Sequence, residues 1–358
     1  MLRGGKEYRI QEGAWMGGIV IPMNLGENSY GITLERGVLR RAGEIANLRR
    51  KVMIVTDSGV PEKWVRALAS QCESAEVFCM PAGEKSKNLD NFRAVLSRML
   101  AFGMRREDCV AAVGGGVCGD LAGFAAACYM RGIDFINCPT TVLSQVDSSI
   151  GGKTAVDLDG IKNIVGAFYQ PKAVLIDPDT LSTLPERQIA NGLAEAVKMA
   201  LCFDAAEFER FETEDAMARI DQVIGNALRT KKTVVEQDEK EHGLRRVLNF
   251  GHTLGHGIEA QEELGLYHGE CVALGMLAMS APDVRARLEK VLEKLGLPTR
   301  CGAEVSGVIR AAVHDKKASG NTITVIRVEK AGSFTEQRMT PEELEAAYRA
   351  AFGGGQEA

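Results

Sequence analysis

The feature that most constrains the fold is an alternation of short apolar runs with amphipathic segments through the first half of the chain. Segments 61–72 and 88–103 carry apolar residues at helical spacing, so both are predicted to be helices. The apolar runs around them are predicted to be strands: 51–57, 75–80, 108–116, 135–141 and 173–181. Strands that alternate with helices form a mostly parallel sheet with crossover helices. We therefore expect an α/β domain in this half.

The pattern changes after residue 183. Segments such as 191–203, 281–298 and 340–352 have helical spacing, and only 321–334 suggests a short pair of strands. A chain of 358 residues is long for one hydrophobic core, which favours two domains. We predict an α/β domain over 1–183, in which 1–15 is an extension, and a mainly α-helical domain over 184–358.

Composition excludes several classes of protein. The net charge is −5 and like charges do not cluster, which argues against a general nucleic-acid binder. No apolar stretch is long enough for a membrane helix, and the N-terminus lacks the apolar segment of a signal peptide. The nine cysteines form no CxxC pair, which favours free thiols over a zinc–thiolate site. These observations predict a cytoplasmic protein.

A glycine cluster follows the predicted strand at 108–116 and opens a helix of small residues. Backbone N–H groups at such a helix N-terminus can bind a phosphate, and Gly115 and Gly116 would allow its close approach. Asp57, at the end of another strand, is suited to hold ribose hydroxyls. Glu84 and Lys87 lie on a loop nearby in sequence. The motif is neither GxGxxG nor a Walker A loop, so a tight turn with close helix packing stays an alternative.

Three of the five histidines lie within one stretch of the second half. His252 and His256 are four residues apart, which places them on one face of a helix at a spacing typical of metal ligands. His268 follows after a glycine-containing bend. Glu195, in an otherwise apolar helix with Lys198 one turn on, could supply a carboxylate ligand. The alternative is a buried Glu195–Lys198 pair beside ordinary helix-face histidines.

Cationic and amide side chains recur beside glycines: Arg131, Lys153, Lys162, Asn163, Lys231, Arg245, Asn249, Lys316 and Lys317. In an acidic protein this pattern indicates pockets for an anionic ligand. Taken singly, however, each lysine or arginine could equally be an exposed surface residue.

Longer motifs resemble the 3-dehydroquinate synthase family: GGGVCGDLAGFAAACYMRG, PTTVLSQVDSSIGGKTAV, KNIVGAFYQP, TLPERQIANGLAEAVK, DEKEHGLRRVLNFGHTLGHGIE and YHGECVALGM. The resemblance extends from about Gly18 to about Tyr348. It implies a Rossmann-like α/β domain, a mostly α-helical domain and an active site in the cleft between them. Other sugar-phosphate cyclases and metal-dependent polyol dehydrogenases share this fold and stay alternatives, as does a non-catalytic NAD-binding protein.

The resemblance also implies an activity. Members of the family convert 3-deoxy-D-arabino-heptulosonate 7-phosphate to 3-dehydroquinate and phosphate, in the shikimate route to aromatic amino acids. They use NAD+ that is recycled within each turnover and a divalent metal, usually Zn2+, with Co2+ as a substitute. We therefore expect a phosphate-eliminating carbon–oxygen lyase that acts on a phosphorylated sugar acid.

Roles for individual residues follow from the motif match. The metal ligands would be Glu195, His252 and His268. His256 and Asn249 would serve the substrate and a proton relay, with Asp147 at the reacting hydroxyls. The substrate phosphate would be bound by Lys153, Asn163, Lys198 and one of Lys316 and Lys317, and the carboxylate by Lys231 and Arg245.

The same match assigns the cofactor site and an assembly. The NAD+ residues would be Asp57, Glu84, Lys87, Gly115, Gly116, Asp120, Thr140, Thr141, Lys153, Lys162 and Thr183. In this family the residue at Arg131 reaches the neighbouring subunit's site, which implies a homodimer.

Overall fold

The computed structural model describes residues 18–314 and 322–353. Lys316 and Lys317 lie outside the described residues. The chain divides into two compact units. Within the described part of the chain, one unit contains 18–185 together with 220–240, and the other contains 186–219, 241–314 and 322–353. Among the described residues, no helix combines the length and the apolar character that crossing a membrane requires.

A seven-stranded sheet organises the first unit, with the order β1-β2-β9-β6-β5-β3-β4. The strands are β1 (Ile19–Met23), β2 (Tyr30–Leu34), β3 (Lys51–Asp57), β4 (Ser74–Met80), β5 (Cys109–Gly114), β6 (Asp134–Pro139) and β9 (Ala173–Ile176). All neighbours are parallel except β1 and β2. The five predicted strands and the predicted parallel sheet are confirmed.

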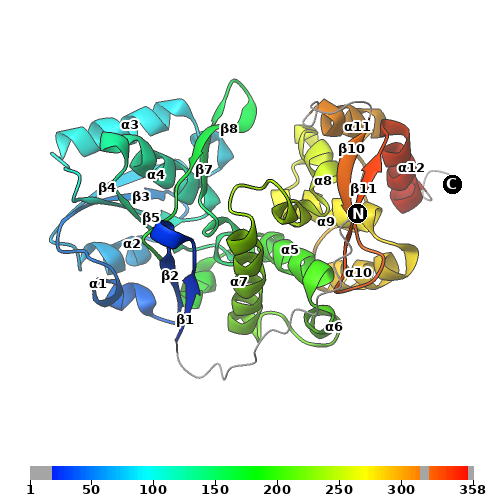
Figure 1. Cartoon of the computed structure of the whole chain (residues 1–358), viewed down its shortest axis with the longest axis horizontal. Helices are drawn as coiled ribbons and strands as arrows, with labels where there is room; N and C mark the ends of the chain where they lie inside the picture. Colours follow the sequence, from blue (N-terminus) through cyan, green and yellow to red (C-terminus); the bar gives the residue numbers. More distant parts are fainter. Residues whose placement is uncertain (1–17, 315–321, 354–358) are drawn as a thin grey trace. The chain divides into compact units, whose positions relative to one another are not determined.

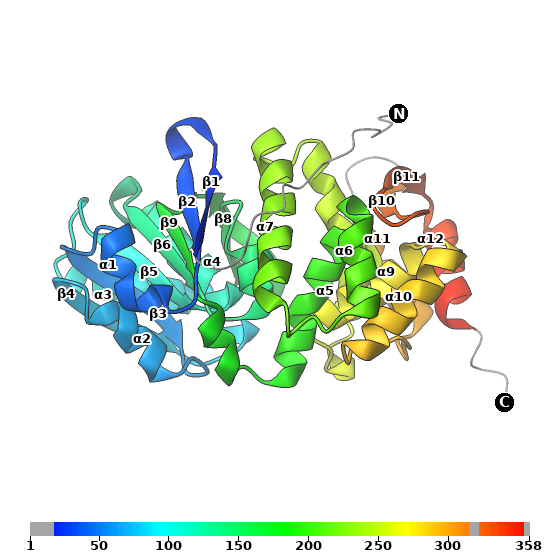
Figure 2. The same ribbon diagram turned by 90° about the horizontal axis from the view of Figure 1, so that it is seen from below.

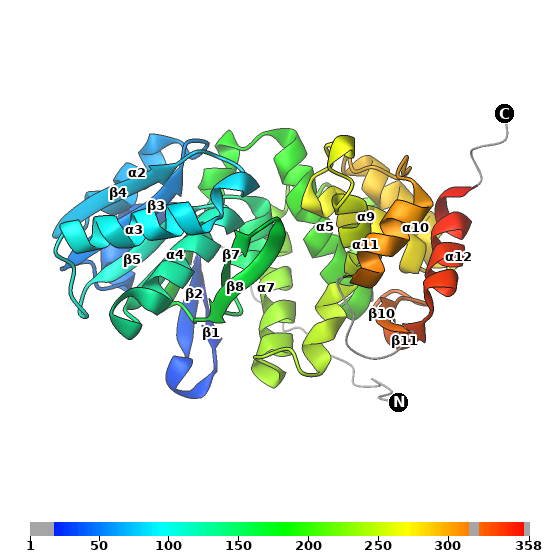
Figure 3. The same cartoon turned by 90° about the horizontal axis from the view of Figure 1, so that it is seen from above.

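Helices cover both faces of this sheet because its inner strands are apolar on both sides. Along β3, Met53 and Val55 pack with α3 (Leu89–Ala101) and α4 (Gly116–Cys128). Val52 and Ile54 point the other way and pack with α2 (Glu62–Ala69) and α1 (Ala42–Ile45). Figure 2 shows α1 and α2 on one face, and Figure 3 shows α3 and α4 on the other.

A separate antiparallel hairpin, β7 (Lys153–Leu158) and β8 (Ile161–Phe168), projects beside α4 (Figure 1). This hairpin was not predicted from the sequence. Asp159 and Gly160 connect the strands and both have positive φ, 49° and 79°. Two such residues form a type I′ turn, for which Asp-Gly is a strong signal.

The second unit is mostly helical: α5 (Glu186–Phe203), α6 (Ala205–Thr213), α8 (His252–Glu259), α9 (His268–Met279), α10 (Pro282–Lys294), α11 (Val305–His314) and α12 (Pro341–Phe352). Its central element is α9, which contacts α5, α8, α10 and α12 and is buried from Gly269 to Met279. Strands β10 (Ile323–Arg327) and β11 (Thr335–Met339) form the predicted short pair.

Helix α7 (Ile220–Gln237) belongs to the sheet unit, whereas the predicted division of the chain placed it in the second domain. It packs in the sheet unit against β1 and the π-helical turn η5 (Ser144–Ser148). Arg36 fixes the start of α7 through a hydrogen bond from Nη2 to Asp221 Oδ1 at 2.7 Å. Periodicity predicts a helix but not its packing partner, so local sequence could not place α7.

Short turns connect these elements: η1 (Gly26–Asn28), η2 (Val38–Arg41), η3 (Glu84–Ser86), η4 (Tyr129–Arg131), η6 (Pro178–Thr183), η7 (Leu244–Asn249) and η8 (Glu262–Leu264).

Candidate metal centre and nucleotide site

Three donor groups from three helices meet in the helical unit. Glu195 comes from the middle of α5, His252 begins α8 and His268 begins α9. Glu195 Oε1 lies 3.6 Å from His252 Nε2 and 3.7 Å from His268 Nε2. Ligands of a tetrahedral zinc, each about 2.1 Å from the ion, lie about 3.4 Å from each other. The separations are therefore close to those of ligands around one ion.

Glycines bring α8 and α9 close enough for this arrangement. A Cβ on Gly275 would lie 1.8 Å from the carbonyl oxygen of Gly251, and one on Gly255 would lie 3.1 Å from that of Cys271. The glycines at 251 and 255 directly precede the two histidines of the HxxxH motif. These glycines thus allow the two helix backbones to touch, which places His252 and His256 beside the start of α9.

Both candidate ligand histidines, His252 and His268, are oriented through their second ring nitrogen. His252 Nδ1 lies 3.1 Å from the carbonyl oxygen of Phe250, and His268 Nδ1 lies 3.2 Å from Glu259 Oε2. Each Nε2 is therefore left to face Glu195. Metal-binding histidines are commonly held this way by a carbonyl or carboxylate on the other nitrogen.

The electrostatics of Glu195 fit a bound cation. Its side chain is 0% exposed and forms an ion pair with Lys198. Neither carboxylate oxygen has a hydrogen-bond partner among the residues that the structure describes. Burial opposes ionisation, but Lys198 together with His252 and His268 outweighs it, and the pKa of Glu195 is held well below its usual value. A buried charge without hydrogen bonds is costly unless an ion satisfies it.

The two histidines differ in protonation. Burial and the nearby charge of Lys198 lower the pKa of His252 well below its usual value, so its ring is neutral and can bind a metal. Burial also opposes the charge on His268, but the carboxylates of Glu195 and Glu259 outweigh it and raise the pKa of His268 to about 10. A metal ion would displace that proton on binding.

His256 belongs to a second possible group of donors, with Glu259 and His268. Its ring centroid lies 5.4 Å from that of His252 and 5.9 Å from that of His268. In this group Glu259 already contacts His268 Nδ1, so it acts as an orienting partner. The group with Glu195 is the better metal site because it offers a buried carboxylate and two convergent Nε2 atoms.

Other predicted residues of the helical unit lie on α5 or on the turn η7 before α8. Lys198 pairs with Glu195. Arg245 is 2% exposed and lies with Asn249 on η7, the turn that leads into α8. Asn249 Nδ2 donates to Glu241 Oε1 at 2.8 Å. Glu241 and Glu259 are contacts that the sequence analysis missed, and only their places within the family motifs could have indicated them.

The sheet unit contains a topological switch point. β3 connects onward to β4 on one side, and the chain then returns to form β5 on the other side of β3. In open α/β sheets, ligands bind at the carboxyl ends of the strands at such a point. Asp57 ends β3, and Gly115 and Gly116 follow β5 at the start of α4. The predicted ribose and phosphate groups therefore lie on adjacent strands at this point.

The local contacts fit a nucleotide site. Asp57 Oδ1 accepts a hydrogen bond from Gly59 N at 2.8 Å, and Cys118 Sγ donates to Asp57 Oδ2 at 3.2 Å. A Cβ on Gly116 would come within 3.0 Å of Ser148 Oγ, so the start of α4 is tightly enclosed. Thr140 and Thr141 follow β6, the next strand along.

A small ionic cluster joins η3 to α4 through Lys87, Glu84 and Asp120. Lys87 Nζ lies 2.5 Å from Glu84 Oε1 and 3.4 Å from Asp120 Oδ2. Burial raises the pKa of Asp120 to about 6 against the opposing charge of Lys87. Thr183, predicted for the same site, ends η6 and accepts a weak hydrogen bond from Trp64 Nε1 at 3.4 Å.

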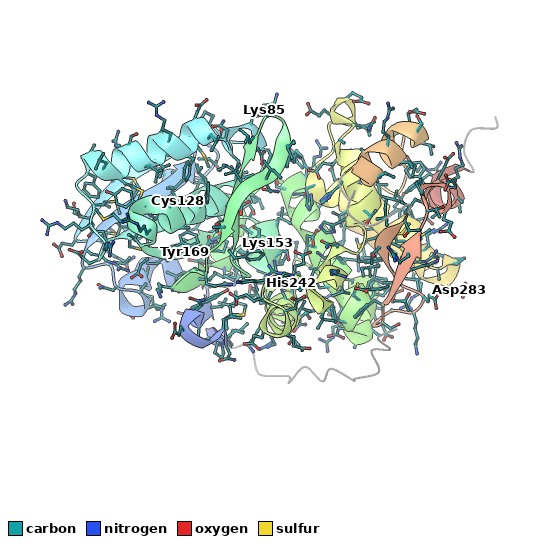
Figure 4. The ribbon with its side chains drawn as sticks, turned by 45° about the horizontal axis from the view of Figure 1, so that its top comes forward. Lys85, Cys128, Lys153, Tyr169, His242 and Asp283 are labelled. Atoms are coloured by element: carbon teal, nitrogen blue, oxygen red, sulfur yellow. The ribbon has the colours of Figure 1, made fainter. Side chains whose placement is uncertain are left out.

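The remaining predicted residues of this unit lie on η5, the hairpin and η4. Asp147 Oδ1 lies 2.7 Å from Lys231 Nζ, so the structure pairs two residues that the sequence analysis assigned to different roles. Lys153 begins β7, and Lys162 and Asn163 lie on β8. Figure 4 shows Lys153 near the base of this hairpin and Lys85 near its tip, where Asp157 N donates to the carbonyl of Lys87 at 2.8 Å.

Arg131 is exposed at the end of η4. It and Met130 both have positive φ, 69° and 50°. Such conformations are unfavourable for residues other than glycine and persist where the surroundings or a function require them.

Two sequence models match the chain: 3-dehydroquinate synthase N-terminal over residues 77–191 and 3-dehydroquinate synthase C-terminal over residues 192–318. A 3-dehydroquinate synthase of Acetivibrio thermocellus is 40% identical over 330 residues, which cover 86% of this chain and 92% of that protein.

Two solved cyclase structures are similar to the chain over nearly its whole length. A 2-deoxy-scyllo-inosose synthase complexed with carbaglucose-6-phosphate, NAD+ and Co2+ superimposes with a TM-score of 0.84 at 25% identity, covering 93% of this chain and all of the other. A 2-epi-5-epi-valiolone synthase from Streptomyces hygroscopicus, with NAD+ and Zn2+ bound, gives a TM-score of 0.80 at 26% identity, covering 96% and 99% of the two chains.

Proposed function

The chain belongs to the 3-dehydroquinate synthase family, and from this premise we propose how its residues divide the work of the reaction. That reaction converts 3-deoxy-D-arabino-heptulosonate 7-phosphate to 3-dehydroquinate and phosphate, a step of the shikimate pathway. The enzyme is a carbon–oxygen lyase. The 40% identity to a 3-dehydroquinate synthase against 25% to a solved cyclase of another kind favours this activity within the fold.

Two cofactors are assigned, NAD+ and a divalent metal. Both solved cyclases hold NAD+, one with Co2+ and the other with Zn2+. When bound, the metal polarises a substrate hydroxyl while NAD+ accepts the hydride from its carbon. Glu195, His252 and His268 would hold the metal. One observation carries the proposal. Glu195 Oε1 lies 3.6 Å from His252 Nε2, and the buried carboxylate accepts no hydrogen bond among the described residues.

The NAD+ residues surround the switch point of the sheet unit. Gly115 and Gly116 at the start of α4 would meet the pyrophosphate, and Asp57 would hold ribose hydroxyls. The remaining residues of the set would line the rest of the cofactor: Glu84, Lys87, Asp120, Thr140, Thr141, Lys153, Lys162 and Thr183.

Three polar residues are assigned to the substrate hydroxyls and to proton transfer. His256 lies beside both ligand histidines without being needed as a ligand, so it can exchange a proton with the substrate. Asn249, held by Glu241, would orient a substrate hydroxyl. Asp147 would accept a hydrogen bond from a reacting hydroxyl, with Lys231 paired to its carboxylate at 2.7 Å.

The substrate carries two anionic groups, and each needs charge-assisted partners. The phosphate is assigned to Lys153, Asn163, Lys198 and one of Lys316 and Lys317. The carboxylate is assigned to Lys231 and Arg245. Lys198 is also the partner of Glu195, so it would link the metal ligand to the phosphate.

Assembly and location complete the proposal. Arg131, exposed and held at positive φ, would reach into the site of a second subunit of a homodimer. All nine cysteines are free, which supports a cytoplasmic enzyme because thiols persist in a reducing compartment.

Phosphate release from the heptulosonate phosphate tests the activity. We expect release that needs NAD+ and stops with a chelator, with no net accumulation of NADH. A polyol dehydrogenase would instead form NADH in proportion to product. Stoichiometric NADH, or release that is indifferent to both cofactors, would contradict the proposal.

A further inference from the structure

The first turn of α5 is tied to the start of α9 by a side chain that has no assigned role. Arg187 donates from Nε to Glu270 Oε1 and from Nη2 to Glu270 Oε2, both at 2.7 Å. Nη2 also donates to the carbonyl of Gly265 at 2.8 Å, and the guanidinium lies 4.1 Å from the ring centroid of Tyr267. A bidentate, stacked arginine is held in one orientation.

A second tie lies one turn further along α5. Asn191 Oδ1 accepts a hydrogen bond from Gly269 N at 2.6 Å. A Cβ on Gly269 would lie 1.9 Å from the carbonyl oxygen of Asn191, so the two helix backbones are in direct contact here. Asn191 is 6% exposed, and any shift of α9 along α5 would break this buried hydrogen bond.

These contacts lie on both sides of His268, a proposed metal ligand, along the chain. Arg187, Asn191 and Glu195 are spaced by four residues and share one face of α5. The groups that Arg187 and Asn191 contact precede and follow His268, the first residue of α9. Glu270 Oε2 also accepts a hydrogen bond from Tyr267 N at 2.8 Å, which closes the first turn of α9.

We infer that Arg187 and Asn191 are positioning residues of the metal centre. They fix the register of α9 against α5, so that His268 Nε2 meets Glu195 at the separation that ligands of one ion need. The inference rests on the proposed function, because it takes Glu195, His252 and His268 as the metal ligands. Neither residue touches the metal, so each acts through the placement of His268.

The same unit offers a matched control. Arg287 donates to Glu212 from Nε at 2.7 Å and from Nη2 at 2.5 Å, and its guanidinium lies 5.1 Å from the ring centroid of Phe208. The side chains of Arg187 and Arg287 are 50% and 46% exposed. Arg287 joins α10 to α6, and neither helix carries a predicted ligand. Loss of this pair should affect stability alone.

The test measures Zn2+ and Co2+ affinity of the metal-free full-length chain by competition with a chelator. Arg187→Ala and Asn191→Ala should each weaken binding by about tenfold or more, as loss of outer partners of metal ligands does. Arg187→Lys keeps the charge but lacks the fork, so it should also bind less tightly. At saturating Co2+ the visible absorption of these variants should differ from that of the unsubstituted protein. Arg287→Ala should keep both affinity and spectrum.

Equal weakening by Arg187→Ala and Arg287→Ala would overturn the inference, since a general loss of stability would then explain both. Unchanged affinity in Arg187→Lys and Asn191→Ala would also overturn it, and these two variants decide the matter if Arg187→Ala does not fold. His252→Ala separates this outcome from a failure of the proposed function. If His252→Ala loses the metal while the Arg187 variants do not, only the positioning role is wrong. Full metal content in His252→Ala contradicts both proposals.

Discussion

Glu195 is fully buried, ionised and without hydrogen bonds to its carboxylate among the described residues. Lys198 forms an ion pair with it, and both imidazoles stand too far from Oε1 to donate to it. An arrangement of this kind costs free energy in the empty state and is satisfied when a cation binds. At the scale of the residue, the burial of Glu195 is therefore the feature that the proposed metal site explains.

Substitution of the ligands should separate them from His256. Glu195→Gln, His252→Ala and His268→Ala should each lose metal and turnover together, because each removes one of three protein ligands. His256→Ala should keep its metal and lose turnover by about a hundredfold or more, as expected for a general acid–base residue. Metal analysis of purified protein alongside phosphate release provides the measurement. Loss of metal from His256→Ala would show that the division of the histidines is wrong.

Asp120 gives a prediction for pH. Its pKa is raised to about 6 by burial, above its unfolded value, so the folded state holds the proton more tightly. Its contribution to stability is present at low pH and is lost as pH rises from about 4 to about 6. Relative to the parent, NAD-free Asp120→Asn should therefore gain about 2 to 3 kcal/mol across this window. Denaturant unfolding at several pH values measures it, and a pH-independent difference would contradict the assignment.

At the scale of elements, the HxxxH motif depends on the glycine that precedes each of its histidines. Gly251 at the N-cap of α8, Gly255 within α8 and Gly275 on α9 allow backbone contact between the two helices. Gly257 plays the same part toward α11, where a Cβ would lie 2.4 Å from the carbonyl oxygen of Val308. The motif is therefore as much a packing surface as a set of ligands.

Gly275→Ala tests this packing. Its Cβ would lie 1.8 Å from the carbonyl oxygen of Gly251, so α8 and α9 must separate. Overpacking of this kind should cost about 1 to 3 kcal/mol in the free energy of unfolding. Gly43→Ala, in α1 with its closest contact at 3.6 Å, is the control and should be neutral or stabilising. Similar unfolding midpoints for the two variants would show that the close approach is unimportant.

At the scale of the whole molecule, the predicted residues divide between two compact units. The residues predicted to bind NAD+ lie in the unit with the sheet, and the predicted metal ligands lie in the helical unit. Helix α7 carries Lys231 back into the sheet unit, where it pairs with Asp147. The chain thus crosses between the units more than once, and each unit carries its own part of the predicted site.

A homodimer with Arg131 shared between subunits predicts complementation. Arg131→Ala and His256→Ala should each be inactive alone. Co-expressed, they should form mixed dimers in which one site is intact, which restores about a quarter of the sites in a random twofold mixture. His256→Ala with Glu195→Gln is the control, because both changes disable their own subunit. Absence of rescue in isolated mixed dimers would contradict a shared site.

Much of the fold follows from local pattern. Apolar runs predicted five strands, helical spacing predicted the second half, and the spacing of His252 and His256 predicted a metal-binding helix. The β7–β8 hairpin was missed although Asp159 and Gly160 signal its turn. Its strands are interrupted by Asp157, Lys162 and Asn163, so they lack the sustained alternation of apolar and polar residues by which strands are usually recognised.

The sequence alone determined the parallel sheet, the helical second half, the candidate ligands and, through long motifs, the family. These depend on periodicity and on residue type, which are local properties. Only the tertiary structure decided that α7 packs with the sheet, that Lys231 faces Asp147, and which donors converge on Glu195. Spacing pointed to His252 and His256 as a pair. The contacts between α5, α8 and α9 instead bring His252 and His268 together at Glu195, and these contacts depend on close backbone approach between residues far apart in the chain.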